Sequence, residues 1–88
     1  MTNQLTTEHA LRVYSGRPGC MCGCRGTYRD DAASIKRQVN KMNKLIALIE
    51  AGEEGFTKSD GPGSFGERYV SIESPTRTWV IYYANLAE

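Results

Sequence analysis

Five apolar side chains between positions 35 and 49 recur at intervals of four, three, four and three residues. This spacing places them on one face of an α-helix and is the strongest secondary-structure signal in the chain. Asp30 or Asp31 can cap the start of such a helix, and Gly52 suits its end. The pattern predicts a helix over about residues 32–51, with an apolar stripe formed by Ile35, Val39, Met42, Ile46 and Ile49.

Alternating segments near the C-terminus predict a β-hairpin. Residues 67–73 alternate polar and apolar side chains, and residues 77–84 are rich in β-branched and aromatic types. Ser74-Pro75-Thr76 makes a short connection between them. The second of these strands is apolar on both faces, which favours burial on both sides. The long helix can cover one face, and a second copy of the protein is our expected cover for the other.

The chain is predicted to be a single α+β domain spanning residues 1–88. A small antiparallel sheet packs on one long helix, and the protein is oligomeric. Residues 1–10 are expected to be a flexible N-terminus, residues 11–14 a short strand, and residues 53–66 a loop. Eight aromatic residues argue against intrinsic disorder. No apolar run approaches the roughly 20 residues that span a bilayer, and no signal peptide is visible, so we expect a cytosolic protein.

The net charge of +1 is unevenly distributed. The first 29 residues carry +3, whereas residues 51–88 carry −3. This asymmetry favours an anionic ligand near the first half but falls short of the broad basic surface that duplex DNA requires. On the predicted helix, the face opposite the stripe presents Arg37, Lys41 and Lys44, which we interpret as a solvated face.

Three cysteines, Cys20, Cys22 and Cys24, lie in a glycine-rich loop. Zinc sites usually combine two pairs of ligands, whereas this chain has no second cluster and a single histidine, His9. Small buried thiols are therefore the favoured interpretation, and no metal is predicted. A small metal-binding or nucleic-acid-interaction module built on this loop stays open as the alternative function.

The segment Gly61-Pro62-Gly63-Ser64-Phe65-Gly66 matches GxGxxG. The dinucleotide-binding form of that motif requires a helix after its last glycine, and here a strand pattern follows. The kinase form requires downstream aspartates, and no Asp follows Gly66. We interpret the segment as a turn.

Nothing in the chain identifies a reaction, so we predict neither catalysis nor a cofactor. The residues that remain suit recognition: planar guanidinium groups for phosphate and aromatic faces for a base. Arg37, Phe56 and Arg77 are the candidates. For each residue taken singly, surface charge is the favoured interpretation of the arginines and core packing that of Phe56.

The segment Val13-Tyr14-Ser15-Gly16, leading into Gly19-Cys20-Met21-Cys22-Gly23-Cys24-Arg25-Gly26-Thr27-Tyr28, resembles the signature of the phage-encoded Thoeris anti-defence sponges of the first type. The resemblance extends to a helix that begins like residues 34–39 and to closing strands like Arg77-Thr78-Trp79-Val80-Ile81-Tyr82-Tyr83. It covers about residues 11–84.

This resemblance implies a protein that binds cyclic ADP-ribose isomers with a glycosidic bond between two riboses (glycocyclic ADP-ribose). These are the messengers of bacterial TIR-domain sensors, and the protein keeps them intact. Such proteins act in the host bacterial cytoplasm as dimers or trimers of dimers. Some also take up cyclic oligonucleotides, which would extend inhibition to CBASS defence. Carried over by position, the messenger contacts are Arg77, Arg37, Phe56 and Lys36. The implied cyclic-oligonucleotide loop contains Gly19, Met21, Cys22, Gly23 and Arg25.

Overall fold

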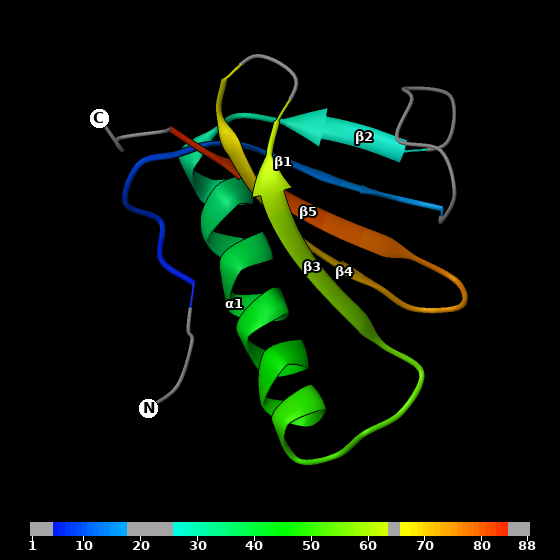
Figure 1. Cartoon of the computed structure of the whole chain (residues 1–88). Coiled ribbons are helices and arrows are strands. Elements are labelled where there is room, and N and C mark those ends of the chain that lie inside the picture. Colours follow the sequence, from blue (N-terminus) through cyan, green and yellow to red (C-terminus); the bar gives the residue numbers. More distant parts are fainter. Residues whose placement is uncertain (1–4, 18–25, 64–65, 85–88) are drawn as a thin grey trace.

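A computed structural model describes residues 5–17, 26–63 and 66–84. Within these ranges the chain forms five strands and one helix (Figure 1). In chain order they are β1 (Ala10–Gly16), β2 (Gly26–Arg29), α1 (Ala32–Glu50), β3 (Thr57–Pro62), β4 (Arg68–Glu73) and β5 (Thr78–Tyr83). The strands form one antiparallel sheet in the order β2-β1-β5-β4-β3. The predicted α+β class, with a small antiparallel sheet on one helix, is confirmed.

The helix starts and ends close to where its sequence predicts. Asp31 is the N-cap, and its Oδ2 accepts a hydrogen bond of 2.9 Å from the Ser34 backbone N–H. Gly52 follows the C-terminus with φ of 97°, a conformation that favours glycine because it lacks a Cβ. These two residues fix the ends of an element whose apolar stripe supplies most of its stabilisation.

The main core lies between α1 and one face of the sheet. Four of the five predicted stripe residues are buried there, and Ile49 packs against them. Strand β1 contributes Val13, β4 contributes Ile72 and β5 contributes Ile81 to the same cluster. The predicted stripe is therefore the surface that holds helix and sheet together.

The opposite face of the sheet has a second cluster within the same chain. Tyr14 and Val80 are fully buried there, Tyr82 is 7% exposed, and Tyr69 packs against them. Strand β5 is thus buried on both sides, as expected, but its burial requires no second copy. This corrects our expectation that a second copy of the protein covers one face of the strand.

An ion pair spans this second face. Arg12 Nη2 donates to Glu67 Oε2 over 2.7 Å, and the Arg12 guanidinium carbon lies 4.2 Å from the centroid of the Tyr82 ring. Glu67 is 6% exposed, so the arginine provides the positive charge that a buried carboxylate requires. The pair ties β1 to the chain segment that leads into β4.

The two edge strands were missed by the sequence analysis. The predicted loop over residues 53–66 contains β3, and the glycine-rich segment up to Tyr28 ends in β2. Every residue of both strands is exposed or half-buried, and neither strand has an apolar alternation in its sequence. Strand β3 also contains Lys58, Asp60 and Pro62, residue types that keep an exposed edge from pairing with other chains.

Hydrogen bonds join the N-terminal segment from Leu5 onward to α1 and β5, within the stretch that the sequence predicts to be flexible. The Leu5 backbone N–H donates to Asn43 Oδ1 over 2.6 Å, and Asn43 Nδ2 donates to the Leu5 carbonyl over 3.0 Å. The Tyr83 hydroxyl donates to the Thr6 carbonyl over 2.8 Å.

Of the helices in the described part, none combines the length and apolar character needed to cross a membrane.

Candidate functional site

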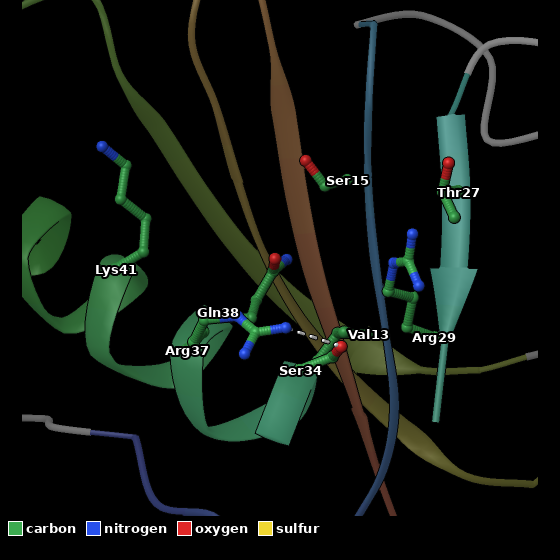
Figure 2. Close-up of a pocket in the computed structure, with 8 residues that line it drawn as sticks. All are labelled: Val13, Ser15, Thr27, Arg29, Ser34, Arg37, Gln38 and Lys41. Carbon is green, nitrogen blue, oxygen red and sulfur yellow. Dashed lines mark hydrogen bonds between the residues drawn. The ribbon is translucent and has the colours of Figure 1, made fainter. Parts of the chain in front are cut away.

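A pocket of about 230 Å³ opens between the N-terminal half of α1 and the strands β1 and β2 (Figure 2). Strand residues form one wall and a single flank of the helix forms the other. We call it the cationic pocket. Its lining residues are Val13, Ser15, Thr27, Arg29, Ser34, Arg37, Gln38 and Lys41.

Strand register brings the sheet wall of the cationic pocket together. Ser15 of β1 pairs with Thr27 of β2 on one side and with Trp79 of β5 on the other. Because cross-strand partners point to the same face of a sheet, these side chains stand in one row. Val13, two residues before Ser15 on β1, pairs with Arg29 of β2 and is part of the core beneath the helix. Side chains two residues apart on a strand share a face, so this row lies on the helix side of the sheet.

Helical spacing brings the other wall together. Ser34, Arg37, Gln38 and Lys41 lie at positions i, i+3, i+4 and i+7, which form a single flank of α1. Gln38 anchors this flank to the sheet. Its Nε2 donates to the Tyr14 carbonyl over 2.7 Å and to the Val80 carbonyl over 3.3 Å. The helix is thereby fixed against β1 and β5 at the base of the pocket.

Three cationic side chains line the cationic pocket, and its described lining contains no carboxylate. Arg37 Nη2 donates to Ser34 Oγ over 3.2 Å, and Lys41 Nζ lies 5.7 Å from the centroid of the Trp79 ring. In the described part of the chain the ion pairs are His9 with Glu8 and Arg12 with Glu67, so the lining cations form no ion pair there. An acidic group near Arg37 is the N-cap Asp31, whose carboxyl pKa is lowered chiefly by its hydrogen bonds with Ser34 and also by the Arg37 charge. The described lining itself is positively charged, which suits an anion.

Arg77 lies at the border of this pocket. Its Nη1 donates to Ser15 Oγ over 2.7 Å. The turn before β5 positions it, since Ser74 Oγ accepts from the Arg77 backbone N–H over 3.1 Å and the Ser74 N–H donates to the Arg77 carbonyl over 2.8 Å. A fourth cation is therefore held beside the three that line the pocket.

The structure brings together two of the four messenger contacts carried over by position. Arg37 lines the cationic pocket and Arg77 borders it. Lys36 instead lines a separate hollow with Thr7, Ala10, Asp30, Ala32 and Ile35. Phe56 packs against the main core beyond the C-terminus of α1, as the core-packing interpretation of that residue had it. Phe56 comes after the end of α1, whereas Arg37 is near its start, and the part of the helix that follows Arg37 is about 20 Å long.

Six polar lining residues were not predicted as site residues: Ser15, Thr27, Arg29, Ser34, Gln38 and Lys41. Arg29 and Thr27 belong to the edge strand β2, which shows no apolar periodicity. The sequence places Ser15 at the start of a loop and Lys41 on a solvated helix face. Lys41 could have been identified from its four-residue spacing from Arg37, which places both on one flank of a helix. The sequence around Ser15 and Arg29 gives no indication that these residues lie beside the helix.

The loop residues Gly19, Met21, Cys22, Gly23 and Arg25 lie outside the described residues, as do Cys20 and Cys24. Over residues 5–17, 26–63 and 66–84, no three or more His, Cys, Asp or Glu side chains are grouped so that they could hold a metal ion. Of the glycine-rich segment 61–66, Gly61 and Pro62 are the last residues of β3, which corrects the interpretation of the whole segment as a turn. The Gly63 N–H donates to the Glu67 carbonyl, and Gly66 has φ of 87°. Residues 64–65 lie outside the described residues.

The chain matches no protein family model, no curated protein and no solved structure with which it was compared.

Proposed function

We propose that the protein binds a cyclic ADP-ribose messenger in the cationic pocket and holds it without cleaving it. One observation carries this proposal: Arg29, Arg37 and Lys41 converge on one pocket without a carboxylate among its described lining. Guanidinium groups match the oxygens of a phosphate with paired, charge-assisted hydrogen bonds. A ligand with two linked phosphates supplies the negative charge that this site lacks.

The hydroxyl groups of the pocket support a role in binding. Ser15, Thr27 and Ser34 can donate to phosphate or ribose oxygens. Nucleophilic use of a hydroxyl requires a base within hydrogen-bond reach, and Ser15 and Ser34 instead contact Arg77 and Arg37. The described lining therefore fits sequestration, in which affinity and slow release suffice.

The pocket is smaller than most small-molecule sites, and a second copy of the chain would complete it. Small-molecule sites commonly enclose roughly 300–1,000 Å³, and this one encloses about 230 Å³. A second protomer over the open side would enlarge it and bury more of the ligand. We therefore propose a homo-oligomer, a dimer or a trimer of dimers, acting in the cytoplasm of the host bacterium against Thoeris defence. Uptake of cyclic oligonucleotides by the 19–25 loop, and with it inhibition of CBASS, is part of the same proposal.

Calorimetric titration with glycocyclic ADP-ribose tests this function, together with native mass spectrometry of the complex. We expect saturable binding that weakens as salt is raised, because the partner charges are screened. We also expect the ligand to be carried by an oligomer. A monomer that gives no heat with this ligand would contradict the proposal.

A further inference from the structure

The cationic pocket has an aromatic neighbour. Trp79 of β5 is the cross-strand partner of Ser15, a lining residue, and both stand on the helix side of the sheet. Its ring is half-buried and packs against the main core. Trp79 is the chain's single tryptophan. An indole face at the border of a phosphate-binding pocket is positioned to receive a base.

Lys41 connects the ring with the pocket. Its Nζ lies over the Trp79 ring, 5.7 Å from the centroid, and the same side chain lines the cationic pocket. Lys41 is itself exposed, so it is weakly held over the ring, because water competes for the ammonium group. An anionic ligand competes more strongly for the same charge. The lysine can therefore leave the ring when a phosphate enters.

The other aromatic candidates lie elsewhere. Phe56 packs against the core beyond the far end of α1, although the resemblance assigns it to the messenger. Tyr28 of β2 pairs with Tyr14 on the opposite face, where their ring centroids are 4.7 Å apart. Trp79 alone among these shares a row with a residue of the pocket.

We infer that Trp79 is the surface on which the base of the bound nucleotide stacks, and that Lys41 moves from the ring to a ligand phosphate when the base arrives. This inference rests on the proposed function and adds the residue that reads the base. Phosphate binding by the arginines is independent of it.

The single tryptophan makes the inference measurable. Glycocyclic ADP-ribose is titrated into the wild-type protein with emission and heat recorded in parallel. We expect quenching of the tryptophan emission that saturates at the calorimetric stoichiometry. Trp79→Leu should weaken binding roughly tenfold or more, the loss typical of removing a ring from a base. Trp79→Phe keeps an aromatic face and should stay within about threefold of wild type.

A matched pair of lysine variants tests the second part of the inference, the movement of Lys41 from the ring to a ligand phosphate. Lys41→Met should weaken binding and alter the emission of the free protein, whereas Lys44→Met on the exposed helix surface should do neither. Calorimetric binding without any change in tryptophan emission would overturn the inference and leave the proposed function standing. Unchanged affinity in a folded Trp79→Leu variant would do the same. Absence of binding by the wild type would overturn both.

Discussion

The guanidinium of Arg77 donates a 2.7 Å hydrogen bond to the hydroxyl of Ser15, a residue 62 positions earlier in the chain. This contact joins the start of β5 to the wall of the cationic pocket. It connects an arginine that the sequence singled out with a serine that the sequence did not. The candidate site thus depends on strand pairing as much as on residue type.

Arg37→Ala should weaken messenger binding by about 1.5–3 kcal/mol, roughly ten- to hundredfold, because a charge-assisted hydrogen bond to phosphate is lost. Lys36→Ala changes the neighbouring position but lies against a different hollow, so we expect little effect. Calorimetric titration of both variants measures the difference. Equal losses in the two would place the ligand outside the cationic pocket.

Arg29→Ala should cost a similar amount, since Arg29 lines the same pocket from β2. This residue tests the structure separately from the resemblance, which did not assign it. Lys58→Ala on the exposed edge strand β3 is the control that removes one positive charge elsewhere. Equal losses of affinity in Arg29→Ala and in the control would indicate a general charge effect and contradict a localised site.

Ser74→Ala should weaken binding through Arg77, because the Ser74 hydroxyl holds the backbone of the turn that carries this arginine. A double-mutant cycle with Arg77→Ala separates this positioning role from a general loss of stability. The Ser74 effect on affinity should disappear once Arg77 is absent. Additive losses in the double variant would show that Ser74 acts independently.

Gly26→Ala should destabilise the fold by about 1–3 kcal/mol, the usual cost of overpacking. A Cβ at this position would lie 2.5 Å from the Ser15 carbonyl oxygen and 2.6 Å from the Tyr14 ring. Gly61→Ala is the matched control in a second edge strand, where the nearest atom would be at 3.6 Å. Urea unfolding of both variants provides the test, and equal midpoints would contradict the packing described here.

Burial raises the pKa of the Tyr82 phenol to about 12, with a further contribution from its hydrogen bond with Tyr28. A pKa above the unfolded value of about 10 favours the protonated folded state. This contribution to stability is complete below pH 10 and is lost as the pH rises through about 12. Tyr82→Phe should therefore flatten the fall in stability between pH 10 and 12, as measured by urea unfolding. An unchanged slope would argue against a buried phenol.

The elements with a buried face could be predicted from the sequence, and the exposed ones could not. The stripe from Ile35 to Ile49 predicts α1, and the alternation before and after Ser74 predicts the β4–β5 hairpin, because each pattern records one buried surface. Strands β2 and β3 form by pairing with neighbouring strands, and their sequences have no apolar alternation from which they could be predicted. The cationic pocket needs β2, so its arginine from that strand could not be foreseen.

Recovery of the ligand after binding tests the central claim most directly. The protein is saturated with glycocyclic ADP-ribose, freed of excess ligand, denatured by heat, and the released nucleotide is identified by mass spectrometry. The account predicts stoichiometric release of the unaltered cyclic compound, with Arg37→Ala retaining far less of it. Release of a linear or otherwise cleaved product, or retention of no nucleotide at all, would contradict it.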